Sequence, residues 1–343
     1  IVIGVFCILF ARPMLQALHT KSDLIDAAVL YLKIYALGMP AMAVYNFGNG
    51  VLSAKGDTKS PLIYLAVAGV LNIILNLIFV IGFHLAAAGV AIASAIAQYV
   101  SMLLVIRNLL KRRDVCRLQV SKIQFHHDVA KGILLMGIPT GMQNAIFALA
   151  NLFVQRGVNY FYTIMVSGNA AATNADAIIF NVMSAFYTGC ASFVSQNRGA
   201  GNRERMKKSY LVALTYSFLI GLFLGACLFF GGRYFLRAFA TDRAVIDAGM
   251  ERVKIMAFAY SISAFMDCTI AASRGLGKSI GPMIIVMLGS CVFRIIWVYT
   301  IFAHFHTIPS LYLLYPFSWT LTAIAEIVYF IVQFRKVMPK SRI

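Results

Sequence analysis

Three acidic side chains, Asp176, Asp267 and Glu326, lie inside long apolar stretches of the sequence. An ionisable residue in a lipid-embedded helix needs a partner or a water-filled cavity, so each of the three is a candidate functional group. A carboxylate that faces a cavity can bind a cation, and it loses the charge that binds the cation when it takes up a proton. We therefore predict cation binding or ion coupling at these positions. The alternatives are a structural ion pair between Asp267 and Arg294, and a solvated or turn-capping role for Asp176 near the outer interface.

Other polar residues share these apolar segments. Arg156 and Arg294 are predicted to be buried basic groups, and a buried charge requires a partner. Amides donate and accept hydrogen bonds without a fixed charge, which suits a cavity of broad specificity. The alternative for each amide is simple hydrogen bonding between helices. The predicted cavity-lining residues are seven amides and one hydroxyl: Gln143, Asn144, Asn151, Asn174, Asn46, Asn72, Asn76 and Ser94.

The elements that must position these groups are membrane-spanning helices. Of the 343 residues, 61% are hydrophobic and 12% are charged, and the mean hydropathy is +0.81. A soluble domain needs more polar residues to cover its surface. The apolar stretches are also long enough to cross a hydrocarbon core as helices, and they lack the alternation of membrane β-strands. The sequence therefore predicts an all-α polytopic membrane protein.

The formal charge of +18 follows the positive-inside rule rather than indicating nucleic-acid binding. When the loops are assigned alternately to the two sides, one side holds 20 Lys and Arg residues and the other holds 8. The first side includes residues 107–131, 198–208 and the C-terminal tail. We therefore expect a multi-pass protein of the plasma membrane with a cytoplasmic C-terminus.

The sequence repeats itself. Residues 11–36 align with residues 232–257 at 10 of 26 positions, including Arg12 with Arg233 and Asp26 with Asp247. After a predicted small slip, Lys55-Gly56 in "SAKGDTKSP" aligns with Arg274-Gly275 in "SRGLGKSIGP". Both basic turns fall on the predicted cytoplasmic side, which indicates two parallel repeats related by an axis along the membrane normal.

The repeat divides the chain into two lobes. Residues 1–110 form an incomplete first lobe with the end of helix three and helices four to six, residues 111–128 form a basic cytoplasmic connector, and residues 129–343 form a second lobe with helices seven to twelve. Comparison of the two lobes predicts that about 90 residues, roughly two and a half helices, precede Ile1 in a complete twelve-helix protein.

Several motifs together resemble the multidrug and toxic compound extrusion (MATE) transporters. They include "YLKIYALGMPAMAVYNFGNGVLSAKGDTKSP", "GIPTGMQNAIF", "SQNRGAGNRERMKK" and "SRGLGKSIGPMIIVMLGSCVFRIIW". The resemblance covers essentially the whole chain. It implies two six-helix lobes around a central cavity, and an antiporter that exports organic cations in exchange for Na⁺ or H⁺. Small organic cations and the lipid bilayer are then the expected partners, with no nucleic acid and no obligate protein partner.

The resemblance also implies an ion-binding network in the first lobe, from which this sequence departs. Asn72 matches the family's Asn, but Asn76 stands where the family has Asp and Ser94 stands where it has Thr. An amide does not titrate, so we predict that coupling depends on the second lobe.

Two other functions were weighed. A lipid-linked oligosaccharide or lipid flippase of the same superfamily would need several basic residues to hold a pyrophosphate, and only Arg156 and Arg294 are predicted inside the helices. An intramembrane enzyme is disfavoured because the sequence contains neither HExxH nor GxSxG. We expect no cofactor beyond the coupling ion, and no metal site, because the His residues lack further ligands nearby.

Overall fold

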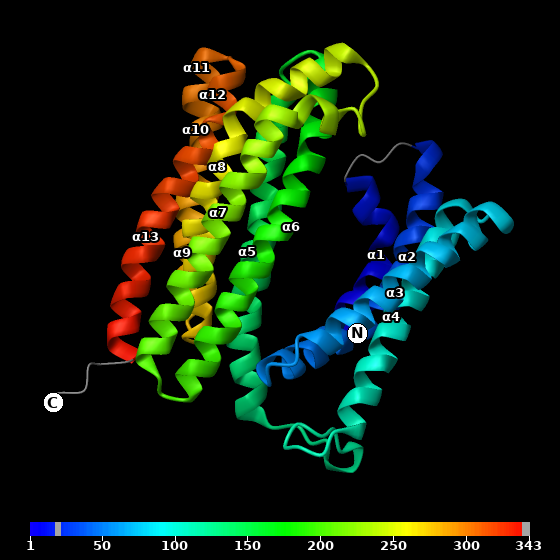
Figure 1. Cartoon of the computed structure of the whole chain (residues 1–343). Coiled ribbons are helices and arrows are strands. Elements are labelled where there is room, and N and C mark those ends of the chain that lie inside the picture. Colours follow the sequence, from blue (N-terminus) through cyan, green and yellow to red (C-terminus); the bar gives the residue numbers. More distant parts are fainter. Residues whose placement is uncertain (18–21, 338–343) are drawn as a thin grey trace. The chain divides into compact units, whose positions relative to one another are not determined.

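The computed structural model describes residues 1–17 and 22–337 (Figure 1). Residues 18–21 of the predicted first lobe and 338–343, which include the predicted cytoplasmic C-terminus, lie outside the described residues. Within the described ranges the chain forms helices and no strands. Nine of the helical segments in these ranges are long and apolar enough to cross a membrane. The predicted class, an all-α polytopic membrane protein, is confirmed.

The chain divides into two compact units, Ile1–Gln124 and Phe125–Ile343. In the first unit, α2 packs against α1 and α4, and α3 packs against α4. Its buried side chains, such as Tyr45, Leu52 and Val105, form a small apolar cluster between these helices. The helices of the first unit are α1 (Val2–Ala17), α2 (Ser22–Ala54), α3 (Lys59–Asn76), the π-helix η1 (Leu77–Gly82), α4 (Ala86–Lys111) and the short 3₁₀ helix η2 (Val120–Lys122).

The second unit is built around one buried helix, α8, which packs against α6, α7 and α13. Its long helices are α5 (His127–Val158), α6 (Thr163–Gly199), α7 (Arg203–Leu236), α8 (Arg243–Gly275) and α13 (Leu314–Val337). A further span comprises α9 (Ile280–Val286), η3 (Met287–Val292), α10 (Phe293–Trp297), η4 (Val298–Phe302) and α11 (Ala303–Phe305), and α12 (Ile308–Tyr312) leads into α13.

Local sequence explains where α8 begins and how closely α6 packs against it. The Asp242 side chain caps α8 by accepting a hydrogen bond from the Ala244 backbone N–H at 2.9 Å. Further along, Gly168 of α6 lies directly against Gly249 of α8. A Cβ added at Gly168 would lie 2.6 Å from the Gly249 backbone nitrogen. Two glycines therefore allow the backbones of α6 and α8 to approach each other, as small residues do in membrane bundles.

The internal repeat is visible in side-chain contacts. Arg12 pairs with Asp26 in the first unit, and Arg233 pairs with Asp247 at 2.8 Å in the second. The four residues are those that the sequence repeat aligns. The same ion pair therefore forms at equivalent places in both units.

The predicted slip at the basic turns is wrong. Gly56 and Gly277, which are 221 residues apart in the sequence, both adopt a left-handed conformation, with φ of 82° and 72°. The helices before the turns, α2 and α8, start and end 221 residues apart, as do the starts of α3 and α9. Lys55-Gly56 therefore does not correspond to Arg274-Gly275. That alignment also matched Lys59-Ser60 with Lys278-Ser279. The left-handed glycine sets the register instead, because this conformation favours glycine.

Candidate functional site

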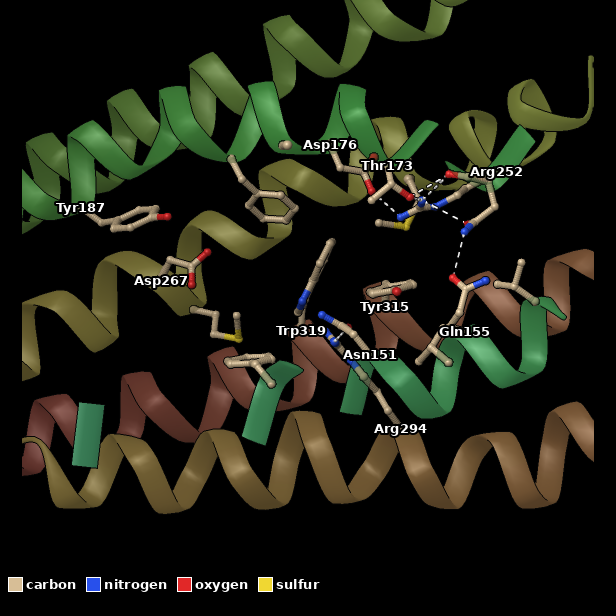
Figure 2. A pocket seen from close by; sticks show the side chains of 18 residues that line it. Asn151, Gln155, Thr173, Asp176, Tyr187, Arg252, Asp267, Arg294, Tyr315 and Trp319 are labelled. Carbon is tan, nitrogen blue, oxygen red and sulfur yellow. Dashed lines mark hydrogen bonds and ion pairs between the residues drawn. The ribbon is translucent and has the colours of Figure 1, made fainter. Parts of the chain in front are cut away.

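A cavity of about 440 Å³ lies within the second unit. It is lined by residues of α5, α6, α8, α10 and α13, so five elements contribute to one site. Its walls combine aromatic rings with charged and amide side chains (Figure 2). The volume falls within the range of small-molecule sites.

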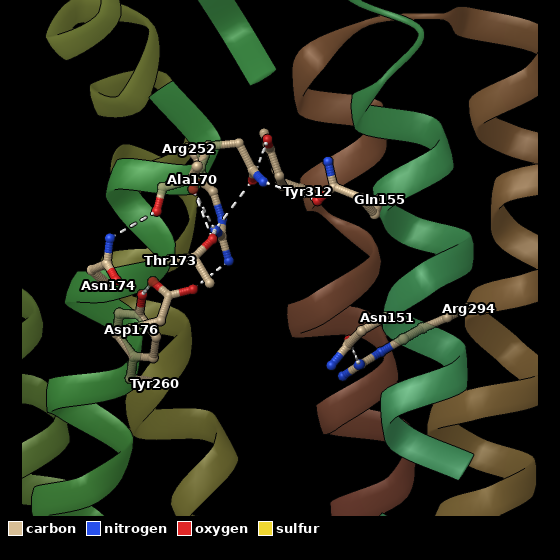
Figure 3. Close-up of polar contacts among 11 residues, drawn as sticks. Asn151, Gln155, Ala170, Thr173, Asn174, Asp176, Arg252, Tyr260, Arg294 and Tyr312 are labelled. Atoms are coloured by element: carbon tan, nitrogen blue, oxygen red, sulfur yellow. Dashed lines mark hydrogen bonds and ion pairs between the residues drawn. The ribbon is translucent and has the colours of Figure 1, made fainter. Parts of the chain in front are cut away.

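An ion pair between Asp176 of α6 and Arg252 of α8 lies at this cavity, and both side chains are buried. Tyr260 also donates a hydrogen bond to Asp176. The other terminal nitrogen of Arg252 donates to Thr173 Oγ1 at 2.7 Å and to Asn169 Oδ1 at 3.2 Å (Figure 3). A buried ion pair is stable only when further hydrogen bonds satisfy its atoms. These contacts provide most of them, since only Nε of the Arg252 guanidinium is buried without a partner.

This pair decides against one alternative and corrects one count. The alternative that Asp176 is solvated or caps a turn near the outer interface is wrong, because its side chain is buried and bonded to two residues of α8. Arg252 is one of the eight Lys and Arg residues counted on the outer side, but it lies within α8 and is buried. The sequence does contain a signal for the pair: Asn169, Thr173 and Asp176 are spaced on one face of α6, and such a polar stripe requires a partner on the helix opposite.

Arg294 of α10 is buried, as predicted, and lines the same cavity. Its guanidinium donates to Asn151 Oδ1 at 3.3 Å and to Ser318 Oγ at 3.3 Å. It also lies over the Tyr315 ring at 4.6 Å from the centroid. The alternative considered for Asp267, an ion pair with Arg294, is not formed, because amide, hydroxyl and aromatic partners hold the guanidinium instead.

Asp267 of α8 lines the cavity and is half-buried, and the described residues include no ion-pair partner for it. Figure 2 shows Asp267 near Tyr187 at one end of the cavity, with Arg252 and Gln155 at the other. Trp319 lies between these ends in the same view. One end of the cavity therefore combines a carboxylate with aromatic rings.

Two predicted residues lie elsewhere in the second unit. Gln143 of α5 is buried and accepts a hydrogen bond from Arg274 at 2.9 Å. Glu326 of α13 is completely buried, and neither of its carboxylate oxygens has a hydrogen-bond partner. Neither residue lines the cavity that holds Asp267.

Other predicted residues are exposed. Arg156 was expected to be buried, but it is exposed, and its guanidinium contacts the Tyr299 hydroxyl at 3.3 Å. The reason is its place in the last turn of α5, where a long basic side chain can extend toward the membrane interface. Asn174 is also exposed and donates to the backbone of its own helix at 3.2 Å. Of the predicted amides of the second unit, only Asn151 lines the cavity, whereas Asn144 and, in the first unit, Asn46 are exposed.

The first-unit residues of the predicted network do come together. Asn76 donates to Asn72 Oδ1 at 3.0 Å, and Asn72 donates to Ser94 Oγ at 3.4 Å. All three side chains are neutral, so the described part of this network has no group that titrates near neutral pH. Among the described residues there is also no group of three or more His, Cys, Asp or Glu side chains placed to hold a metal ion.

The sequence is similar to those of known proteins. "Probable multidrug resistance protein YpnP" of Bacillus subtilis (strain 168) is 28% identical over 247 residues, which are 72% of this chain and 55% of that protein. The "FAD transporter" of Shewanella oneidensis is 24% identical over 251 residues, covering 70% of this chain and 54% of that protein. The chain thus spans about half the length of these relatives.

Solved structures share the fold. The structure titled "Outward-facing conformation of a multidrug resistance MATE family transporter of the MOP superfamily" matches with a TM-score of 0.90 and 19% identity, covering 98% of this chain and 76% of that one. A model of the MatE family matches residues 1–78 and 139–300, which is well over half of the chain. The chain therefore belongs to the MatE family of multidrug and toxic compound extrusion transporters.

Proposed function

We propose that this protein exports small organic cations across the plasma membrane in exchange for H⁺ or Na⁺. The observation that carries the proposal is Asp267, a carboxylate without an ion-pair partner that faces a cavity lined with aromatic rings. An aromatic face attracts a cation, and a nearby carboxylate offsets the loss of water around it.

The same carboxylate accounts for exchange. A proton or Na⁺ on Asp267 removes the negative charge that binds the organic cation, so the two cations compete for one group. When the two cations bind at the same group in turn, transport of one is linked to the opposite movement of the other. The Asp176–Arg252 pair carries no net charge, and we assign it the task of holding α6 and α8 together at the cavity wall.

The orientation in the membrane is proposed from the charges of the loops. Twenty Lys and Arg residues on one side outnumber the eight counted on the other, one of which, Arg252, is buried in α8. This excess supports a cytoplasmic position for the basic segment between the units and for the C-terminus.

The flippase alternative has less support. Arg252 adds a second guanidinium to Arg294 at the cavity, but Asp176 neutralises it. Among the described residues that line the cavity, only Arg294 is left to balance a pyrophosphate, and it already bonds Asn151 and Ser318. A doubly charged headgroup would therefore be poorly compensated.

Exchange of a fluorescent cationic dye against an inward proton or Na⁺ gradient, in everted vesicles that contain the protein, tests the proposal. We expect Asp267→Asn to reduce exchange by at least tenfold, because the amide binds neither the dye cation nor the coupling ion well. Asp128→Asn is the matched control, since Asp128 is exposed at the start of α5. Full exchange by Asp267→Asn would remove this residue from the mechanism.

A further inference from the structure

Glu326 differs from every other described carboxylate in its surroundings. It lies in the middle of α13 with an exposed fraction of 0%, and both of its carboxylate oxygens are buried without a hydrogen-bond partner. A charged carboxylate in this condition would lose its hydration and gain nothing in return. Glu326 therefore requires a positive species that the hydrogen bonds of this conformation do not supply.

The interface around Glu326 can be followed from contacts one turn away. Thr322, four residues earlier on α13, shares a hydrogen bond of 2.9 Å with Ser290 of η3. Ser290 also contacts Met266 Sδ of α8 at 3.8 Å. Because residues four apart lie on one helix face, Glu326 continues the interface of α13 with η3 and α8. The described contacts along this interface come from hydroxyls and sulfur, not from charged groups.

One cation acts on Glu326 from this side. The charge of Arg274, near the end of α8, interacts with Glu326 and also with Asp267. Tyr329, three residues further along α13, also interacts with the charge of Glu326. Arg274 is not bonded to either carboxylate: one of its terminal nitrogens donates to Gln143 Oε1 at 2.9 Å, and its Nε is buried without a partner.

Arg274 and Glu326 each have what the other lacks. Arg274 has a buried donor without an acceptor, Glu326 has two buried acceptors without a donor, and their opposite charges attract each other. Na⁺ would need several oxygen ligands around Glu326. Both carboxylate oxygens lack a hydrogen-bond partner, so no hydroxyl of the described residues is held against them. A proton requires no such ligand shell.

We propose that Glu326 is a proton-binding site, separate from the cavity of Asp267, and that Arg274 is the group that replaces the proton. In the conformation described, Glu326 holds the proton and Arg274 is held by Gln143. When a change of conformation brings water to Glu326, the carboxylic O–H bond breaks and the proton passes to that water. The guanidinium of Arg274 then turns from Gln143 and neutralises the carboxylate. Proton and guanidinium then exclude each other, so protonation selects the position of Arg274 at the end of α8.

Infrared difference spectra of the membrane-reconstituted protein, recorded as the pH is changed without substrate, test the proposal. The C=O stretch of a protonated carboxyl is separate from that of a carboxylate, so a titrating Glu326 gives its own band. We expect Glu326→Gln to remove this band, while Glu204→Gln leaves it unchanged. Glu204 is the matched control because it is exposed and pairs only with Lys208. Asp267→Asn identifies any contribution from Asp267.

The role of Arg274 gives a second measurement. Removing the cation in Arg274→Gln disfavours the carboxylate, so the midpoint of the band should move by about 1–3 pH units to higher pH. Arg274→Lys keeps the charge and should move it less. If Glu326→Gln does not fold, Glu326→Asp should retain the band with a shifted midpoint.

Three results would overturn the proposal: the band persists in Glu326→Gln, its midpoint is unchanged in Arg274→Gln, or Na⁺ abolishes it at constant pH. None of these measurements involves a transported dye. The proton site can therefore fail while the export function holds, and the reverse is also true.

Discussion

At the scale of single residues, the site is dominated by charges that find partners on other helices. Asp176 and Arg252 lie 76 positions apart in the sequence and meet only because α6 packs on α8. The sequence indicated that Asp176 needed a partner but could not identify Arg252, because a charge near the start of a helix resembles a loop charge. Arg156 shows the opposite error. Its apolar neighbours in the sequence suggested that it is buried, but it lies near the end of a helix and is exposed.

The ion pair makes a prediction about stability. Arg252→Gln leaves the buried Asp176 charge without its cation, and we expect it to lower the free energy of unfolding by about 3–5 kcal/mol. Thermal unfolding in detergent, followed as Tm, measures the loss. The double variant Asp176→Asn/Arg252→Gln has no unpaired charge and should recover much of it. Equal Tm values for the single variant and the unchanged protein would show that the pair is not formed.

At the scale of elements, the helices and the basic turns could be predicted from sequence because long apolar runs and glycine-containing turns are local signals. The register of the second turn could not, because two pairs of matching residues favoured a shifted alignment over the left-handed glycine. The close packing of α6 against α8 could not be predicted from the sequence either. Glycine is common in membrane helices, and only the packing shows that Gly168 and Gly249 face each other.

This contact can be tested with a single methyl group. In Gly168→Ala the new Cβ would lie 2.6–3.0 Å from backbone atoms of α8. This distance is too short, and the backbone of a helix cannot move aside as a flexible side chain can. We expect α6 to shift, the Asp176–Arg252 pair to loosen, and stability to fall by about 1–3 kcal/mol. Gly189→Ala on the same helix is the control, since its Cβ meets nothing within 4 Å and alanine favours the helix. Equal Tm values for the two variants would contradict the proposed close packing.

At the scale of the whole molecule, the sequence repeat predicted that equivalent residues would make equivalent contacts, and the two Arg–Asp pairs show it. The relation between the two units could be recognised from sequence because the repeat keeps identical residues near the ends of equivalent helices. The polar site was harder to predict, because the repeat does not preserve its basic residues: at the offset of 221, Arg252 corresponds to Tyr31 and Arg294 corresponds to Ile73. At these two positions the units diverge where the candidate chemistry lies.

The orientation of the two repeats is open to a direct test. If the repeats are parallel, Lys55→Cys and Lys278→Cys, each in a turn after an equivalent helix, lie on the same side of the membrane. We expect a membrane-impermeant maleimide to leave both unlabelled in intact cells and to label Arg237→Cys. A background without the six native cysteines is required, because Cys227 is exposed. Labelling of only one of the two turns from outside would mean that the repeats are inverted.

The constant spacing between the two copies has a consequence for how the chain arose. If one ancestral half was duplicated, many side chains have since been replaced, yet from α2 to the start of α3 neither copy has gained or lost a residue relative to the other. One inserted residue would rotate all that follows in a helix by about 100° and turn its packed face toward lipid. Evolution in this segment has therefore been free to change chemistry but not length.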